Sequence, residues 1–260
     1  SQRQAPSSSL GGPLLDSQLF VARINGAGAE TVAPVVSGAF QPAVSPGGSE
    51  VAYFSRVSSG SGFASLYVKS LQTSAVRLVS SQCGLPGFAL YPLEWVHQML
   101  AWSPDGSLFF VEDSDEGSLL RRYHSHDGTT TNVTGLLRAL VFDLYPSPAG
   151  DRLAYLLYHD RAFHVRERTL SSGEERVLQT WPNSSASEYQ LRGWASTGGL
   201  VVVRRLVRPA ADRPQMEVFV LEAGGARRVA NIAGAYAVTA ALRPRGAFMI
   251  AIERASASEA

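Results

Sequence analysis

Few residues in this sequence have the type and spacing that metal binding or acid–base catalysis requires. His124 and His126 stand two apart on a predicted strand, so they share one side of it, but a zinc site needs a third ligand. Asp113 and Asp115 offer oxygens to calcium without the glycine and distal glutamate of an EF-hand loop. Cys83 has no neighbouring base in sequence and is interpreted as an apolar filler. We therefore predict no catalytic residue, cofactor or metal.

Composition excludes several broad classes of protein. The chain has 260 residues, with 23 basic against 22 acidic residues, and this near-neutral balance argues against a dedicated nucleic-acid binder. One cysteine cannot form an internal disulfide. No apolar run approaches the roughly 18 residues of a membrane helix, so we expect no membrane insertion in this region. Residues 1–16 are rich in Ser, Gly, Pro and Gln, which predicts a flexible linker ahead of a folded domain at residues 17–260.

A repeat underlies the elements that must position any functional residue. Its clearest copy is Trp-Ser-Pro-Asp-Gly, ending at Gly106 and followed by an apolar run. Related copies end at glycines 48, 150, 198 and 246, and four of the five keep the proline. Each copy predicts a β-hairpin, since Pro and Asp favour a turn and Gly accepts the positive φ that ends it. A second hairpin follows each of the first four, so the period is about four strands in under 60 residues, as in a propeller blade.

The strand count predicts one all-β domain built as a five-bladed β-propeller of four-stranded antiparallel blades. The fifth copy stops after two strands, and residues 19–33 supply a separate hairpin at the other end of the chain. We expect these N-terminal strands to complete the C-terminal blade and close the ring, which would remove its open edges.

The Trp-Ser-Pro-Asp-Gly unit, followed by an apolar strand and a Gly-containing hairpin, resembles the repeat of TolB-like propellers. The same repeat is found in the propeller domains of the dipeptidyl and oligopeptidase families. The resemblance covers roughly residues 17–254, only the copy ending at Gly106 matches fully, and five blades are fewer than the six usual in TolB-like rings. It implies the fold and a periplasmic or extracellular location, in keeping with the processed-looking N-terminus. The turn residues themselves are structural.

Loop length differs between the two faces of the predicted disc. The first-to-second and third-to-fourth turns of each blade share one face and are short, whereas the other face collects most of the long connections, where binding residues concentrate. Alternatively, these loops are tolerated insertions without a partner. The candidate partner-binding residues on the long-loop face are aromatic or charged: Phe63, Phe88, Tyr91, Asp113, Asp115, Glu116, Trp181, Arg208 and Arg213.

The central channel is the second candidate site. Its predicted lining residues are Gln98, Asp143, Gln190 and Arg192. A five-bladed glycosidase would need two carboxylates at the axis, and Asp143 is the only one in the predicted inner strands.

The leading functional hypothesis is a non-enzymatic scaffold that binds another protein, or another part of a larger parent polypeptide, through the long-loop face. The first alternative is a ligand-sensing or peptidase-accessory domain that uses the channel, and an enzyme in its own right comes third. No nucleic acid is expected as a partner, and the sequence leaves oligomeric state open.

Overall fold

The structure is a computed structural model of the 260-residue chain, and every secondary-structure element among its described residues is a β-strand. It describes residues 18–25, 28–37, 39–56, 64–83, 98–114, 116–184, 187–195, 197–206, 215–233, 235–242 and 248–254, with side chains described between residues 39 and 232. Within these ranges no helix is long and apolar enough to cross a bilayer. The predicted linker at residues 1–16 lies outside them.

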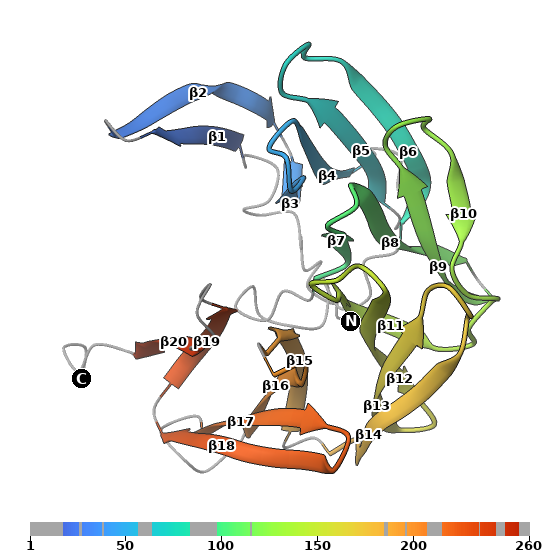
Figure 1. The fold of residues 1–260 in the computed structure, drawn as a ribbon, viewed down its shortest axis with the longest axis vertical. Helices are drawn as coiled ribbons and strands as arrows, with labels where there is room; N and C mark the ends of the chain where they lie inside the picture. The colour runs from blue at the N-terminus through green and yellow to red at the C-terminus, as the bar shows by residue number, and fades with distance from the viewer. Residues whose placement is uncertain are drawn as a thin grey trace, which may run out of the picture.

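Four antiparallel sheets of four strands each form four complete blades (Figure 1). Blade 1 contains β3 (Ala39–Val44), β4 (Glu50–Arg56), β5 (Ala64–Ser70) and β6 (Val76–Cys83). Blade 2 contains β7 (Leu100–Trp102), β8 (Ser107–Ser114), β9 (Gly117–His124) and β10 (Thr130–Asn132). Blade 3 contains β11 (Leu140–Pro146), β12 (Arg152–His159), β13 (Ala162–Thr169) and β14 (Glu175–Pro182). Blade 4 contains β15 (Ser187–Trp194), β16 (Leu200–Leu206), β17 (Gln215–Glu222) and β18 (Gly225–Ala233).

The predicted closure of a fifth blade is not formed in the structure. The N-terminal strands β1 (Gln18–Asn25) and β2 (Gly28–Ser37) pair only with each other, and so do β19 (Ala235–Leu242) and β20 (Phe248–Arg254). Figure 1 shows these two sheets at opposite ends of an open arc. The hairpins were predicted correctly, but four complete blades and two separate half-sheets replace the five-bladed closed ring. Pairing across the ring requires tertiary placement that hairpin patterns do not encode.

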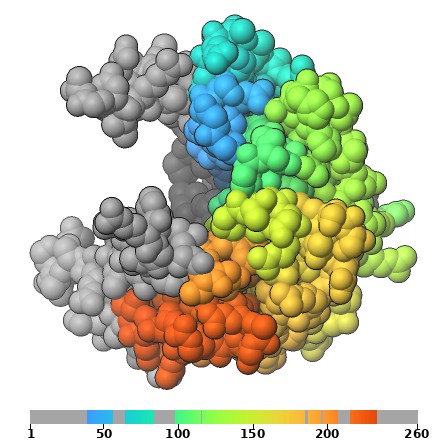
Figure 2. Space-filling view, viewed as in Figure 1, coloured from blue at the N-terminus to red at the C-terminus, as the bar shows by residue number. Residues whose placement is uncertain are grey.

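The inner strands of successive blades lie side by side around the axis. Strand β3 neighbours β7, β7 neighbours β11, β11 neighbours β15, and β15 neighbours β19. Their buried side chains form one core cluster across the four blades, and a second, smaller cluster lies within blade 4. Figure 2 shows the described side chains filling these blades into a continuous body.

The repeat turns adopt the predicted geometry at the start of all four complete blades. The N–H of the closing glycine donates to the carbonyl of the residue three positions earlier, over 2.8 to 3.0 Å. The glycine φ angles lie between +68° and +83°, a region that favours glycine. These turns share one face of the disc, called the turn face below, and the opposite side is called the loop face.

Side chains on the inner strands tie neighbouring blades together. Trp102 Nε1 donates to the carbonyl of Ala43 over 3.0 Å, and Trp194 Nε1 donates to the carbonyl of Tyr145 over 2.9 Å. The two oxygens of Asp143 accept the N–H groups of residues 98 and 191, each over 2.9 Å, so one carboxylate joins three blades. These bonds, called the inter-blade staples below, satisfy polar groups that would otherwise be buried without partners.

Candidate functional site

The structure describes three of the nine predicted partner-binding residues, which are Asp113, Glu116 and Trp181. Glu116 is exposed at the turn between β8 and β9, and Asp113 is partly buried just before it. Trp181 is also partly buried, and its ring stacks on Tyr189 of the next blade with centroids 4.7 Å apart and an interplanar angle of 15°. Trp181 therefore contributes mainly to the contact between blades 3 and 4. The remaining six lie outside the described residues: Phe63, Phe88, Tyr91, Asp115, Arg208 and Arg213.

Two leucines on the loop face, close to the turn between β8 and β9, are exposed. Leu136 and Leu140 keep 42% and 44% of their surface exposed, and Glu116 and Arg138 are exposed as well. We call these four side chains the loop-face ridge. Leu136 lies in the connection between blades 2 and 3, and Leu140 is the first residue of β11. The sequence prediction missed both, although the apolar run Leu-Leu-Arg-Ala-Leu at residues 136–140 was a signal.

The ridge has a fixed backbone because residues 137–139 are clamped onto the turn between β8 and β9. Ser118 and Leu137 exchange two main-chain hydrogen bonds of 2.9 Å, and the Ser118 hydroxyl donates to the carbonyl of Ala139 over 3.0 Å. Gly117 has φ +144°, and a Cβ there would stand 2.2 Å from the carbonyl oxygen of Leu137. Only glycine therefore allows this close approach between the turn and the ridge.

The carboxyl group of Asp113, just before the turn between β8 and β9, is partly removed from solvent. Burial raises the pKa of the Asp113 carboxyl, and the nearby Ser118 hydroxyl only partly offsets this effect. The Oδ1 atom of Asp113 is buried without a hydrogen-bond partner. Burial, together with the negative charges of Glu112 and Asp113, also raises the pKa of the Cys83 thiol to about 12, against the effect of Ser80. A thiol with that pKa stays protonated at neutral pH and is a poor nucleophile.

Two arginines that precede the connection carrying Arg208 and Arg213 are engaged inside blade 4. The Arg204 guanidinium binds the carboxylate of Glu217, which also accepts a 2.8 Å hydrogen bond from Arg228. Arg205 lies 3.8 Å from the carboxylate of Glu188. Arg204 and Arg205 therefore form ion pairs within their own blade.

The predicted channel residues have different environments. Asp143 is 2% exposed, and its carboxylate is engaged in the inter-blade staples described above. Gln190 is 1% exposed, and neither polar atom of its side-chain amide has a hydrogen-bond partner. Gln98 and Arg192 are partly buried. Asp143 therefore joins blades 2, 3 and 4, whereas Arg192 is a partly buried charged residue on β15.

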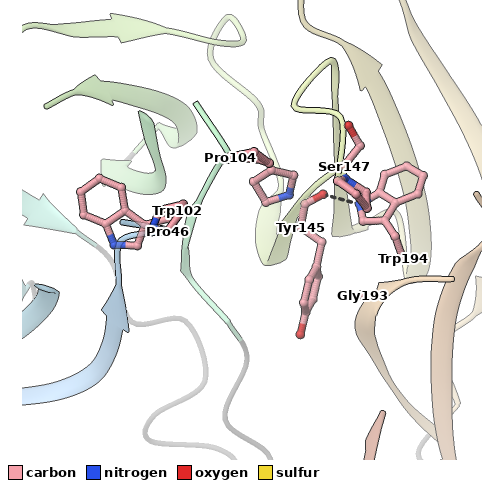
Figure 3. A pocket seen from close by; sticks show the side chains of 9 residues that line it. Pro46, Trp102, Pro104, Tyr145, Ser147, Gly193 and Trp194 are labelled. Carbon is pink, nitrogen blue, oxygen red and sulfur yellow. Dashed lines mark hydrogen bonds between the residues drawn. The ribbon is translucent and has the colours of Figure 1, made fainter. Parts of the chain in front are cut away.

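A pocket of about 290 Å³ opens on the turn face, where the repeat turns of blades 1, 2 and 3 meet the end of β15 (Figure 3). Tyr145 lies between Trp102 and Trp194 in Figure 3, with its hydroxyl directed away from Pro104 and Ser147. The sequence prediction treated these turn residues as purely structural and so missed the pocket. Its lining residues are mostly proline and aromatic: Pro46, Trp102, Pro104, Tyr145, Pro146, Ser147, Pro148, Gly193 and Trp194.

His124 and His126 lie close together at the end of β9 and in the turn after it. The rings of His124 and His126 are 5.9 Å apart, with Thr131 beside the first and Asp127 beside the second. Among the described residues no group of three or more His, Cys, Asp or Glu side chains is arranged to hold a metal ion.

Solved structures that resemble this chain are β-propellers. TolB from Acinetobacter baumannii aligns with a TM-score of 0.56 and 16% identity, covering 88% of this chain and 52% of its own length. A putative TolB from Agrobacterium tumefaciens aligns with a TM-score of 0.55 and 17% identity. The alignment covers 82% of this chain and 74% of that structure. The propeller domain of the Trilobed protease from Pyrococcus furiosus aligns with a TM-score of 0.52 and 14% identity. The alignment covers 74% of this chain and 57% of that structure, which is described as having an open velcro topology.

These likenesses concern the fold, because every identity is low. No family model and no curated protein matches the sequence. The chain spans about half the length of the A. baumannii TolB structure. Both TolB structures and a protease propeller share its architecture, so the likeness does not separate a binding protein from a peptidase domain. The four blades and their repeat turns show that this chain has a TolB-like β-propeller fold.

Proposed function

We propose that this chain is a non-enzymatic β-propeller scaffold that binds another protein through its loop face. The loop-face ridge is the observation that carries the proposal. Leu136 and Leu140 expose apolar surface, and the charged residues Glu116 and Arg138 of the same ridge are exposed as well. Apolar side chains surrounded by polar ones are the composition of protein interfaces, whereas exposed leucines cost solubility when they have no partner.

The clamped backbone favours binding by this surface. The hydrogen bonds from Ser118 to residues 137 and 139 hold the ridge in one conformation before a partner arrives. A preorganised surface loses less conformational entropy on association, so more of the contact energy becomes affinity. Charges of both signs at the rim would orient the partner.

The partner is either a separate protein or another part of a longer parent chain. We also propose a periplasmic or extracellular location, which rests on the resemblance to TolB-like proteins. The other predicted loop-face residues, including Phe88 and Arg208, would extend the same surface.

Selection from a displayed library of random peptides tests the proposal with a matched pair of double variants. Leu136→Ser with Leu140→Ser removes the exposed apolar surface of the ridge. Val76→Ser with Leu78→Ser removes a similar amount from the outer strand β6, where these residues are 52% and 53% exposed. Peptides enriched on the wild-type protein should bind the β6 variant normally and the ridge variant at least about tenfold more weakly.

Two outcomes would contradict the loop-face proposal. One is the absence of any enriched peptide, and the other is equal binding of the enriched peptides to both double variants. Urea unfolding should show that each variant keeps its stability to within about 1 kcal/mol, since all four side chains are exposed.

A further inference from the structure

The turn-face pocket, on the opposite face from the loop-face ridge, has the size of a small-molecule site. Its volume of about 290 Å³ suits a ligand of one or two rings. Four of the nine residues that line it are prolines, which come from blades 1, 2 and 3. Figure 3 shows Tyr145 between Trp102 and Trp194, so aromatic side chains from three blades surround the same space.

The hydrogen-bonding groups of the lining side chains are already used within the protein. The indole N–H groups of Trp102 and Trp194 donate to main-chain carbonyls in the inter-blade staples. The Ser147 hydroxyl donates to Asp151 over 2.7 Å and accepts the N–H of Arg152 over 3.1 Å. A proline has no N–H to donate. These lining residues therefore offer a ligand apolar contacts but no free side-chain donor.

Tyr145 adds an uncharged ring to this lining. Figure 3 shows its hydroxyl directed away from Pro104 and Ser147. Burial, reinforced by the negative charge of Asp143, raises the pKa of Tyr145 against the effect of Arg192, so the phenol stays protonated at neutral pH. Tyr145 therefore contributes aromatic surface to the pocket without a charge.

The described lining residues include no charged side chain, and two carboxylates in the neighbouring turns are paired with arginines. Asp105, in the turn of blade 2, forms an ion pair with Arg122. Asp151, after the turn of blade 3, lies 3.6 Å from Nε of Arg152. A charged ligand in this pocket would lose water without gaining an opposite unpaired charge from the lining, which costs free energy.

We propose that the turn-face pocket binds a small uncharged aromatic molecule. The ring would pack against the prolines and the aromatic side chains, because aromatic rings attract one another in offset or edge-to-face arrangements. A polar substituent on the ligand would stay in water at the opening on the turn face, since the lining has no free side-chain donor for it. The pocket would give the scaffold a ligand-sensing role in addition to protein binding.

Calorimetric titration with four probes of similar size tests the charge and the ring separately. Phenethyl alcohol is the uncharged aromatic probe, and phenylacetate and phenethylammonium carry a negative and a positive charge beside the same ring. Cyclohexylethanol replaces the aromatic ring with a saturated one. Wild-type protein should bind phenethyl alcohol at least about tenfold more tightly than either charged probe, and at least about twofold more tightly than cyclohexylethanol. Tryptophan fluorescence gives a second readout, because Trp102 and Trp194 lie at the site.

Substitution of a rim proline tests whether binding occurs in this pocket. Pro148 lines the pocket and is exposed in the turn of blade 3, so Pro148→Glu should weaken binding of phenethyl alcohol at least about fivefold. Pro148→Ala adds no charge and should weaken binding less. Pro182→Glu is the matched control, because it makes the same change at an exposed proline of β14 that does not line the pocket. This variant should bind phenethyl alcohol normally.

Four outcomes would overturn the proposal: no binding of phenethyl alcohol up to about 10 mM, equally tight binding of a charged probe, equally tight binding of cyclohexylethanol, or unchanged binding by Pro148→Glu. The comparison of the four probes on wild-type protein does not depend on the folding of any variant. The ridge variant with Ser at 136 and 140 should bind phenethyl alcohol normally, so failure of one proposal does not imply failure of the other.

Discussion

The turn face and the loop face are built from the same four blades but by different means. On the turn face, four-residue turns recur from blade to blade, and the inner strands beneath them are joined by inter-blade staples from Trp102, Asp143 and Trp194. On the loop face, the described surface depends on one connection, in which residues 137–139 are held by Ser118. The turn face is therefore built by a motif that repeats from blade to blade, whereas the described loop-face surface is built by one local segment.

The two faces also differ in how many blades form the described surface. Repeated turns around an axis bring residues of all four complete blades together at the turn-face pocket. On the loop face, the exposed leucines are Leu136 in one connection and Leu140 at the start of β11.

The largest expected effect is at the staple that joins three blades. Asp143→Ala should lower the free energy of unfolding by about 3–5 kcal/mol, because two buried main-chain N–H groups lose a charged acceptor. Asp160→Ala is the matched control, since both aspartates have φ +48° but the Asp160 side chain is 82% exposed. The control should cost only about 1 kcal/mol from backbone strain. If urea unfolding gave similar losses of unfolding free energy for Asp143→Ala and Asp160→Ala, Asp143 would not be a staple.

A smaller effect is expected at the clamp of the loop face. Gly117→Ala should cost about 2 kcal/mol and speed hydrogen exchange at residues 133–140, because the new Cβ would collide with the carbonyl oxygen of Leu137. Gly135→Ala, in the same connection, meets nothing within 4 Å and should be close to neutral. Equal hydrogen exchange at these residues in the two variants would contradict the role of Gly117 in the clamp.

The smallest effect is a difference in pH dependence between two aspartates, one on each face. Although partial burial opposes ionisation, the Ser107 N–H and Arg122 hold the pKa of Asp105 on the turn face below its usual value. Its stabilising contribution is therefore present above the pKa of an unfolded aspartate and is lost as pH falls through the folded pKa. Asp105→Asn should lower the free energy of unfolding at neutral pH. The free energy of unfolding of this variant should also fall less steeply than that of the wild type as the pH is lowered.

Asp113 on the loop face should behave in the opposite way. Because burial raises its pKa, native protein holds a proton that the unfolded chain has already released, so stability falls as pH rises from the unfolded pKa to the folded one. Asp113→Asn should therefore raise stability at neutral pH. Urea unfolding between about pH 3 and pH 7 measures both aspartates, and equal signs for the two variants would contradict the contrast between the faces.

Local sequence patterns predicted the hairpins well because their determinants are local. A proline and a glycine at fixed offsets define the turns that end at Gly48, Gly106 and Gly150, and short apolar runs define the strands that follow. The candidate site was predicted less completely. Glu116 and Asp113 lie at the turn between β8 and β9, whereas Trp181, a candidate for partner binding, is partly buried and stacks on Tyr189. Which side chain a neighbouring blade covers depends on packing between distant segments.

By itself, the sequence determined that this chain folds into repeated four-stranded antiparallel units with short turns on one face. Hydrophobic periodicity and turn residues determine strands and turns over a few residues, so both can be recognised from the sequence without a structure. Only the tertiary structure decided that the terminal hairpins remain separate sheets, that Asp143 is a staple, and that the turns of separate blades line one pocket. The physical reason is that ion pairing, desolvation and strand pairing across blades depend on distances between residues far apart in the chain.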